Sequence, residues 1–489
     1  MLHSVRAVLV PVLAAALAAS TLAAPAAAGG RTGDAPLRLS GATPFPDCPP
    51  EAWPYGTVTP NTETEPWVAV NPTDPRHIVV AWQQDRWTTG SSRGMVVALT
   101  RDNGKTWKKV VPPGFTACLG GTFTRATDPW LSFGPRGELY LSATVGSATT
   151  NGVMVAKSVD GGETWATPVT LIADNLYQMF SDKQASTVDT RDPRYVYMVF
   201  NRRNLSTDEH ELLFTRSTDA GATWEQPRAI HRPSPLGNGT VGNQIVVLPD
   251  GTLVNVFFES DHPIGAGPVS PQLPERIRVM RSADRGSTWS APVTIAESEL
   301  NKPVLPDDGS MVPMPGIVPD VAVDNRTGAV YVVWGEAGLS TSRSSVALSA
   351  SYDGGRRWTP PKRVDRSPNS PAGGVGQAFL PQVDVADDGT VAVSYYDFRA
   401  DTPAAGTPTT AWLITCRGSQ CPASPGAWRE RKLAGPFDLQ RATQSFGGPF
   451  LGTYTGLAHT RTEFLAALVQ TNDSAVDPQD VFLVRSAFC

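Results

Sequence analysis

The stretch Thr100-Arg101-Asp102-Asn103-Gly104-Lys105-Thr106-Trp107 decides the fold, because four more copies of its pattern follow along the chain. The shared form is Ser/Thr-x-Asp-x-Gly-x-x-Trp. The other copies run from Ser158 to Trp165, Ser217 to Trp224, Ser282 to Trp289 and Ser351 to Trp358. A pattern that recurs at a spacing of this size indicates one supersecondary unit used several times.

Each copy is predicted to be a hairpin turn. An Asp side chain accepts hydrogen bonds from nearby backbone N–H groups and closes a tight turn. Gly adopts the positive φ angle that such a turn needs. Ser or Thr ends the incoming strand, and Trp begins the outgoing strand and packs on the sheet. We therefore assign a structural role to the five Asp residues, which are Asp102, Asp160, Asp219, Asp284 and Asp353.

Pairs of short apolar strands recur between these turns. Clear examples are 67–70 with 77–82, and 320–323 with 330–334. Each pair and the hairpin after it make four antiparallel strands, and such a unit repeated around an axis is a β-propeller blade. The sequence predicts an all-β chain that forms a single propeller, with seven blades favoured and six possible. The first strands of the seven blades begin near Trp67, Trp130, Ala185, Gln244, Val321, Val383 and Tyr454.

The two ends of the chain suggest its domain organisation. Arg6 precedes an apolar stretch at 7–24, and Ala26-Ala27-Ala28 follows it, which is typical of a secretory signal. We expect cleavage near Ala28 and a secreted, extracellular protein. The segment 29–64 is expected to complete the last blade through residues 37–40, and 65–489 to form the propeller.

Composition excludes several classes of partner. The net charge is −5 and the pI about 5.8, so no basic surface for nucleic acid is expected. No later stretch is long enough to span a membrane, and we expect a monomer. Five cysteines in an oxidising compartment favour disulfides, with Cys416 pairing Cys421 across a turn and Cys48 pairing Cys118. Cys489 is then left unpaired.

The Asp turns resemble the BNR or Asp-box repeats of the sialidase (neuraminidase) superfamily. The segment WVAVNPTDPRHIVVAW at 67–82, followed by TRDNGKTW, is similar to secreted bacterial members, and the resemblance covers about 65–486. It implies a glycosidase that holds a substrate carboxylate with three Arg residues and uses a Tyr nucleophile with an Asp acid/base. The family's first Arg lies in an Arg-Ile-Pro segment. That motif is absent here, where Thr64-Glu65-Pro66-Trp67 takes its place.

Two sets of polar residues are expected on the face opposite the Asp turns. Residues that enter the first strands should surround the axis; they are Glu65, Asp128, Asp182 with Lys183, Asn243, Asp320, Gln382 and Tyr454. Residues that follow the second strands should form an outer set; they are Asp85, Arg86, Arg202, Arg203, Glu259, Glu336, Asp397 and Arg399. Long loops on this face are where function is expected.

The inner set is rich in carboxylates, which suits acid/base work on a glycosidic bond. We predict Asp128 or Asp182 as the acid/base, with Glu259 or Glu336 assisting Tyr454 or a water molecule. The predicted substrate-binding residues are Glu65, Asp85, Arg86, Arg202, Asp320, Asp397 and Arg399. An anionic sugar would need Arg86, Arg202 and Arg399 to converge, whereas paired carboxylates suit a neutral sugar.

Two functions remain open from the sequence. The first is a secreted, sialidase-like glycoside hydrolase that acts on extracellular glycans. The second is a non-catalytic propeller that binds a glycan or a protein through the same face. No metal ligand set and no cofactor are predicted, apart from the possibility of a structural cation on the axis, where several carboxylates gather.

Overall fold

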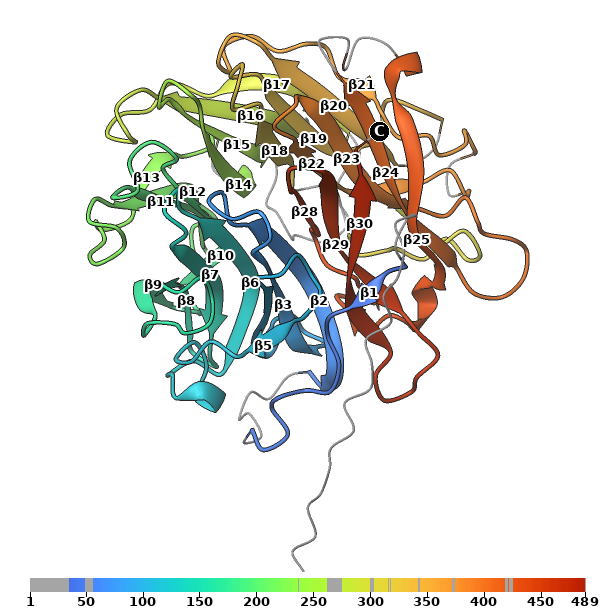
Figure 1. Ribbon diagram of the computed structural model, residues 1–489, viewed down its shortest axis with the longest axis horizontal. Helices are drawn as coiled ribbons and strands as arrows, with labels where there is room; N and C mark the ends of the chain where they lie inside the picture. The colour runs from blue at the N-terminus through green and yellow to red at the C-terminus, as the bar shows by residue number, and fades with distance from the viewer. Residues whose placement is uncertain are drawn as a thin grey trace, which may run out of the picture.

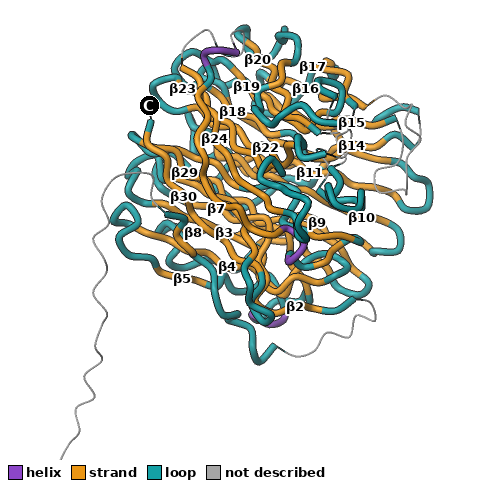
Figure 2. The backbone as a smooth tube through the Cα atoms, turned by 90° about the vertical axis from the view of Figure 1, so that its right-hand side faces the viewer, coloured by secondary structure: helices purple, strands orange, loops and turns teal. Residues whose placement is uncertain are grey.

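The computed structural model shows an all-β chain. It describes residues 35–48, 56–235, 237–261, 275–299, 303–314, 316, 318–341, 344–371, 374–417, 421 and 425–488. The expected signal peptide and Cys489 lie outside these residues. Within them, helix is confined to three short 3-10 turns, and strand and loop make up nearly all of the rest (Figure 2). The three turns are η1 (Ala117–Leu119), η2 (Pro425–Ala427) and η3 (Leu439–Arg441).

Four antiparallel sheets contain four strands each, in chain order. The first two contain β10 (Met179–Val188), β11 (Val196–Asn204), β12 (His210–Ser217) and β13 (Arg228–His231), then β14 (Gly239–Val247), β15 (Leu253–Ser260), β16 (Glu275–Ser282) and β17 (Val293–Ser298). The next two contain β18 (Asp320–Val323), β19 (Val330–Glu336), β20 (Ser345–Ser351) and β21 (Lys362–Arg363), then β22 (Ala378–Val385), β23 (Thr390–Asp397), β24 (Pro408–Arg417) and β25 (Arg429–Asp438).

A larger sheet of twelve strands joins the beginning and the end of the described chain. Its N-terminal strands are β1 (Leu37–Arg38), β2 (Val58–Val70), β3 (Ile78–Trp87), β4 (Ser92–Thr100), β5 (Lys108–Val110), β6 (Arg125–Phe133), β7 (Leu139–Gly146), β8 (Thr150–Ser158) and β9 (Val169–Asn175). Its C-terminal strands are β28 (Gly456–His459), β29 (Glu463–Thr471) and β30 (Gln479–Ala487), while β26 (Gln444–Ser445) and β27 (Gly448–Pro449) form a separate pair. β1 pairs antiparallel with β30, so an N-terminal strand adds an edge to the C-terminal strands.

The sheets are arranged around a common centre (Figure 1). The strands β2, β6, β10, β14, β18, β22 and β28 contact one another in this order, and β28 contacts β2 again. These strands are the first in their groups, so the inner edges of the sheets form a closed cycle. Side chains on the inner strands therefore come together from distant parts of the sequence.

The cores lie between neighbouring sheets, and β3 shows why the sequence folds this way. Ile78, Val80 and Trp82 belong to one buried cluster, whereas Val79 and Ala81 belong to another. Successive side chains of a strand point to opposite faces of its sheet. A continuous apolar run is therefore required, because both faces of this sheet are covered by neighbours.

The turns that contain the repeated Asp share one hydrogen-bond pattern. Asp102 Oδ1 accepts from the Thr106 amide at 2.9 Å, and its Oδ2 accepts from the Thr106 hydroxyl at 2.7 Å. The Thr100 hydroxyl accepts from the Gly104 amide at 2.9 Å. The equivalent bonds recur around Asp160, Asp219 and Asp284. In the fifth copy Asp353 keeps the amide bond, from Arg357 at 2.9 Å, but Arg stands where the other copies have the Thr that donates the hydroxyl bond.

Both disulfides expected from the cysteine positions are present. Cys48 and Cys118 have Cα atoms 5.2 Å apart, and the corresponding distance between Cys416 and Cys421 is 5.9 Å. The second bridge lies between β24 and β25, where the other sheets carry an Asp turn. The disulfide therefore holds the β24–β25 connection together, as the Asp turns do for the equivalent connections.

Candidate functional site

The inner strands carry a bulge at equivalent positions, and this bulge builds the site. The pairing of β2 with β3 shifts between Thr64 and Trp67, and β6, β10, β14 and β22 shift in the same way. The first residue of each bulge has positive φ, and these residues are Glu65 (51°), Asp128 (55°), Lys183 (50°), Gly242 (70°) and Leu380 (52°). A bulge of this kind re-aims side chains and is frequent beside active sites.

Three of these bulge residues are charged and not glycine. A non-glycine residue with positive φ is strained, at a cost of about 1–3 kcal/mol each, and persists only where the surrounding structure holds it. Glu65, Asp128 and Lys183 come from three successive inner strands and meet one another. The strain therefore coincides with a cluster of charges, as is common at functional sites.

Lys183 is the hub of this cluster. Its Nζ lies 3.3 Å from Glu65 Oε1 and 2.5 Å from Asp128 Oδ1. Glu65 Oε1 also accepts from the Thr453 amide at 2.9 Å and from the Thr453 hydroxyl at 2.6 Å. On the other side, Gln83 donates to Glu65 Oε2 and Arg86 Nη1 lies 4.0 Å from that oxygen. We call Glu65, Arg86, Asp128, Lys183 and Tyr454 the axial cluster.

Aromatic rings form one wall of the axial cluster. Trp67 and Trp130 stack with their ring centroids 3.5 Å apart, and each meets Tyr454 edge-on at 5.9 Å. Lys183 Nζ lies 5.5 Å from the centroid of the Tyr454 ring, and the Tyr454 hydroxyl donates to the Pro129 carbonyl at 3.1 Å. These rings exclude water on one side and strengthen the electrostatic interactions beside them.

The two central carboxyl groups have opposite pKa shifts. Burial alone would raise the pKa of Glu65, but the charges of Lys183 and Arg86 outweigh it and lower that pKa to about 2. Burial raises the pKa of Asp128 well above its ordinary value, because the Lys183 charge only partly offsets it and the Glu65 charge adds to it. A hydrogen bond from the Asp128 carboxyl group further lowers the pKa of Glu65. These opposite shifts favour an ionised Glu65 beside a protonated Asp128.

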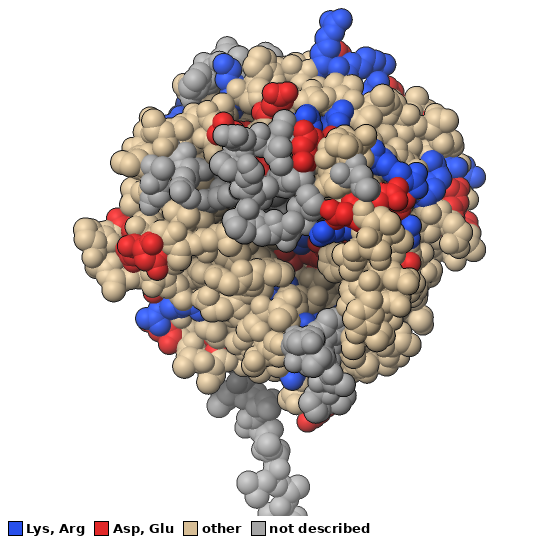
Figure 3. All heavy atoms as spheres, turned by 180° about the vertical axis from the view of Figure 1, so that it is seen from behind, with Lys and Arg blue, Asp and Glu red and all other residues tan. Residues whose placement is uncertain are grey.

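The cluster is compact and buried. Because both carboxylates contact the same ammonium group, their contacting oxygens lie no more than about 6 Å apart. This upper limit is below the separation of about 6.5–9.5 Å at which two carboxyl groups leave room for a water molecule in inverting glycosidases. A cavity of about 10 Å³, roughly the space of one water molecule, is lined by Asp128, Trp130, Lys183 and Tyr454 among others. The opposite view of the molecule shows a hollow near the middle of its surface, with acidic and basic side chains in and beside it (Figure 3).

Two further aspartates were predicted for the inner set. Asp182 lies next to the axial cluster, and Asp320 lies apart from it. Asp182 Oδ1 accepts from the Lys183 amide at 2.9 Å, and burial raises its pKa despite the charge of Lys183. Asp320 Oδ2 accepts from the Val383 amide at 2.7 Å, so it links two sheets. Burial raises the pKa of Asp320 to about 7.

Tyr454 lies in the axial cluster. Its surroundings favour the protonated hydroxyl, whereas a nucleophile would have to lose this proton. Burial raises its pKa well above the ordinary value, and the charges of Glu65 and Asp128 raise it further. Its proton is engaged by the Pro129 carbonyl. Tyr454 thus fits a packing and positioning role better than the nucleophile role expected from the sequence.

The predicted assisting carboxylates belong to other networks. Glu259 pairs with His231 Nε2 at 2.6 Å and with Arg278. Glu336 accepts from the Trp334 indole and from the Gly338 amide, both at 2.9 Å. Glu259 is thus held by its own sheet and by β13 of the neighbouring sheet, and Glu336 by its own strand and the loop after it.

The arginines proposed to converge on an anionic sugar make their ion pairs at separate places. Arg86 belongs to the axial cluster, whereas Arg202 pairs with Glu211 at 2.9 Å and with Asp174 at 3.3 Å. Arg399 pairs with Glu430 at 2.7 Å and stacks on Trp412. A carboxylate-binding triad of these three residues does not form through these contacts.

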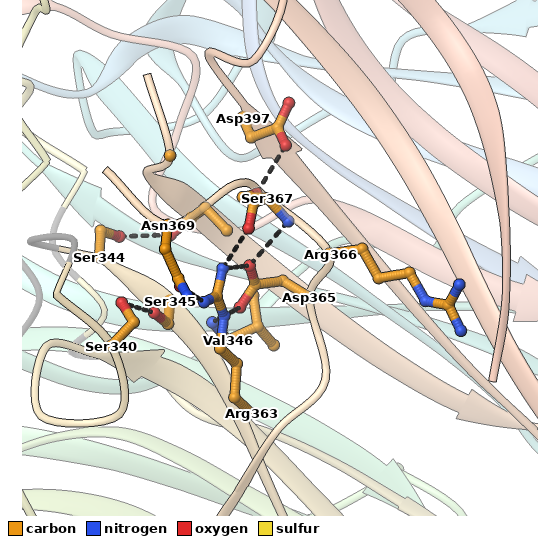
Figure 4. A network of polar contacts seen from close by, with 12 residues as sticks. Ser340, Ser344, Ser345, Val346, Arg363, Asp365, Arg366, Ser367, Asn369 and Asp397 are labelled. Carbon is orange, nitrogen blue, oxygen red and sulfur yellow. Dashed lines mark hydrogen bonds and ion pairs between the residues drawn. The ribbon is translucent and has the colours of Figure 1, made fainter. Parts of the chain in front are cut away.

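Two predicted aspartates also lie in other networks. Asp85 Oδ2 accepts from the Thr43 hydroxyl at 2.7 Å, and its Oδ1 accepts from the Asn61 amide at 2.9 Å. Asp397 accepts from the Ser367 hydroxyl at 2.6 Å, and Figure 4 shows it at the edge of a polar network that continues to Asp365. Asp85 thus fastens the N-terminal segment, and Asp397 fastens a loop of its own sheet.

Sequence reasoning named Lys183 only as a neighbour of Asp182 and missed Gln83 and Thr453. The signal for Lys183 is the alignment of the bulges. Glu65-Pro66-Trp67 and Asp128-Pro129-Trp130 share one pattern, and Lys183-Gln184-Ala185 occupies the same place in the next repeat. Lys183 also places a positive charge beside the carboxylates of the inner strands.

A larger cavity of about 570 Å³ lies on the face that carries the Asp turns. Its lining comes from turns of three neighbouring units and includes Arg136, Arg191, Arg194 and Arg285. Arg194 and Arg285 both pair with Asp192, at 2.8 and 3.4 Å. Its arginines are thus neutralised in part by a carboxylate in the same wall.

The chain was compared with known protein families, curated proteins and solved structures. No family model matches it. It is 26% identical over 300 residues to a xyloglucanase from Paenibacillus sp., which covers 59% of this chain. The match spans about a quarter of the length of that relative (24%).

Solved structures similar to the chain have low sequence identity. An α-L-arabinofuranosidase from Fusarium graminearum has a TM-score of 0.49 and 11% identity, with 93% of this chain and 98% of that chain covered. An α-L-arabinanase from Penicillium chrysogenum has a TM-score of 0.47 and 11% identity, with coverages of 94% and 99%. A NanB sialidase from Streptococcus pneumoniae has a TM-score of 0.44 and 9% identity, with coverages of 88% and 93%.

Helices in the described part of the chain are too short to cross a membrane.

Proposed function

We propose that this chain is a secreted glycoside hydrolase with a seven-bladed β-propeller fold that cleaves a neutral extracellular glycan at the axial cluster. The fold proposal is supported by the closed cycle of the seven inner strands, from β2 to β28. Within the twelve-strand sheet, β2–β5, β6–β9 and β28–β30 with β1 each have the pairing of one blade. A glycan substrate is supported by the 26% identity to a xyloglucanase.

The observation that carries the proposal is the Lys183 bridge between two carboxyl groups of opposite pKa shift. Asp128, with its raised pKa, would donate its proton to the oxygen of the leaving group. Glu65, ionised at neutral pH, would attack the anomeric carbon or activate water. The short spacing of the two groups favours the first course, with a glycosyl-enzyme intermediate and retention of configuration.

Lys183 holds both groups in this arrangement. Its pKa is raised because Asp128 and Glu65 outweigh the effect of burial, so it keeps its positive charge across the physiological range. The ammonium group fixes the ionised form of Glu65 and orients Asp128. Lys183 is thus a positioning residue in this proposal.

The ion pairs of the predicted arginines favour a neutral substrate. Arg202 and Arg399 pair with carboxylates of their own sheets, which leaves Arg86 as the guanidinium of the axial cluster. Arg86 pairs with Glu65 and lies over the Phe450 ring, 4.6 Å from its centroid. A sugar carboxylate would have to displace Glu65 from this charge.

A second function is supported by the burial of the cluster. Glu65 is 1% exposed, Asp128 is 3% exposed, and the adjoining cavity has room for about one water molecule. Such a cluster could fasten the inner strands of a non-catalytic propeller that binds a glycan or a protein through the same face. Binding without cleavage is the outcome that this alternative predicts.

The test is hydrolysis by the purified protein of fluorogenic neutral glycosides, sialosides, xyloglucan and arabinan. Cleavage of a neutral substrate is expected. Asp128→Asn should lower kcat/KM by at least about 100-fold, since general acid catalysis contributes about 10²–10⁴-fold. Glu65→Gln should have an effect at least as large.

The matched control is Asp189→Asn. Asp189 is also buried, but it accepts from the Tyr197 hydroxyl at 2.7 Å and belongs to a turn away from the cluster. This variant should keep full activity. Glycan binding with no cleavage by the wild type, or full activity of Asp128→Asn, would refute the catalytic proposal.

A further inference from the structure

A second group of carboxylates lies where the two ends of the described chain meet. Glu63 on β2, Asp477 in the loop before β30 and Asp480 at the start of β30 each bring a carboxylate oxygen within 4.8 Å of the other two. The strands are joined here by parallel pairing of Thr62 with Gln479. We call Glu63, Asp477 and Asp480 the seam cluster. It is separate from the axial cluster, whose carboxylate from β2 is Glu65.

The hydrogen bonds of Glu63 are incomplete. Its side chain is fully buried, and its Oε1 accepts from the Gln84 amide group at 2.5 Å. Its Oε2 is buried and accepts no hydrogen bond from any residue that the structure describes. The Ser40 hydroxyl is the nearby donor, but it gives its single proton to Asp480 Oδ1 at 2.7 Å.

The negative charge of the seam cluster is only partly compensated. Arg38 pairs with Asp480 Oδ1 at 2.6 Å and also with Asp477. Lys109 donates to the Ser40 carbonyl at 3.1 Å and forms no ion pair with the cluster. Three carboxylates against one guanidinium leave about two negative charges in a buried place, which is costly unless a cation or protons neutralise them.

We propose that the seam cluster binds one divalent cation of the Ca²⁺ class, held by Glu63, Asp477 and Asp480. Ca²⁺ takes oxygen ligands at about 2.3–2.6 Å, so two ligands of one ion lie at most about 5 Å apart. The mutual distances within the cluster meet this limit. The ion neutralises the two negative charges that Arg38 does not compensate. It also provides a partner for Glu63 Oε2.

Protonation is the alternative way to neutralise this site. Burial, with a further contribution from the Asp480 charge, raises the pKa of Glu63 well above its ordinary value. Without a cation, burial therefore favours the protonated form of Glu63. The cation and the proton compete for the same oxygen, and binding should release the proton.

The position of the ion gives it a structural role. β1 contributes Arg38, β2 contributes Glu63 and β30 contributes Asp480, so the three strands that join the chain ends surround the cluster. An ion at this place binds only the folded ring, because its ligands are far apart in the sequence. It should therefore stabilise the closed ring by mass action.

The experiment is calorimetric titration of the EDTA-treated, full-length protein with CaCl₂ and MgCl₂ up to about 5 mM, the range of weak extracellular sites. Thermal melting is followed in parallel. One equivalent of Ca²⁺ is expected to bind and to raise the Tm. Glu63→Gln should weaken Ca²⁺ binding by at least about 10-fold. Without the ion it should melt no lower than the wild type, because the amide, like the protonated carboxyl group, carries no charge.

Two further variants complete the test. Asp477→Asn, at the more exposed edge of the cluster, should also weaken binding. Asp473→Asn is the control, because Asp473 lies in the same loop with its side chain 93% exposed; its Ca²⁺ affinity should equal that of the wild type. No binding of Ca²⁺ or Mg²⁺ by the wild type, or equal binding by Glu63→Gln, would overturn the proposal. Neither readout involves glycan cleavage.

Discussion

At the level of single residues, the repeated turns depend on two consecutive residues with positive φ. In the first copy these are Asn103 (61°) and Gly104 (84°), and in the third they are Ala220 (59°) and Gly221 (82°). Glycine adopts this left-handed conformation without strain, whereas other residues do not. All five copies have glycine at the second of these positions. The first position is strained in the copies where a residue other than glycine occupies it.

Replacing Ala220 by Gly should therefore stabilise the protein. The change relieves the left-handed conformation of Ala220 and leaves intact the backbone carbonyl that accepts from Tyr140 and Lys157. We expect a gain of about 0.5–1 kcal/mol in the free energy of unfolding. Denaturant unfolding measures it.

Ala222→Gly serves as the control for this prediction. Ala222 lies in the same turn and is exposed, and its φ is not positive. There the same substitution only loosens the unfolded chain, so a loss of a few tenths of a kcal/mol is expected. Equal effects of the two substitutions would show that the φ of Ala220 does not matter.

Residue patterns predicted the turns well and the site only in part. The Ser/Thr-x-Asp-x-Gly-x-x-Trp pattern is local, because its hydrogen bonds span four residues or fewer. The contact of Lys183 with Glu65 joins residues from separate repeats, and it depends on bulges whose first residue has no fixed type. Periodicity located these strands but could not say which charged side chains meet.

At the level of elements, neighbouring inner strands are fastened by polar contacts as well as by their apolar cores. His459 at the end of β28 pairs with Asp384 of β22, with 2.7 Å between Nδ1 and Oδ2. Its Nε2 lies 3.6 Å from Asp387. Burial lowers the pKa of His459, but the two carboxylates outweigh it and raise that pKa to about 9.

This pair should make stability depend on pH in the alkaline range. The folded pKa lies above the ordinary value of 6.5, so the full contribution is present below pH 6.5 and is lost as the pH rises through 9. The loss should be up to about 3 kcal/mol between these limits. Urea unfolding at several pH values from 6 to 10 measures it.

Asp384→Asn is the comparison for this pH dependence. The variant should be less stable than the wild type at pH 6, and the difference should shrink towards pH 10. A constant difference over this range would mean that the protonated form of His459 is not what the pair stabilises.

The same scale shows what surrounds two carboxylates that the sequence predicted to assist catalysis. Glu259 and Glu336 follow second strands, as the sequence indicated, yet His231, Arg278 and the indole of Trp334 occupy their oxygens. Arg278 and Trp334 lie on an adjacent strand and on the same strand, respectively, whereas His231 lies on β13 of the neighbouring sheet. The sequence thus predicts at which end of the strand such a residue lies. The direction of its side chain depends on its hydrogen-bond partners, which the sequence pattern does not identify.

At the level of the whole molecule, the chain ends and the axis are two places where distant segments meet. β1 and β30 close the ring at the seam cluster, and the inner strands close it around the axial cluster. Repeat spacing predicted the order of the strands, since each unit is local in sequence. The charge balance at either place depends on residues up to several hundred positions apart, such as Arg38 and Asp480, and no periodicity encodes it.

The ionisation of Asp128 tests the central claim most directly. The account holds that Asp128 is protonated at pH 7 beside an ionised Glu65. The infrared difference spectrum of the wild type minus Asp128→Asn at this pH should therefore contain the C=O stretch of a carboxylic acid. A difference spectrum that contains only carboxylate bands would mean that Asp128 is ionised, and it would contradict the assignment of Asp128 as the acid.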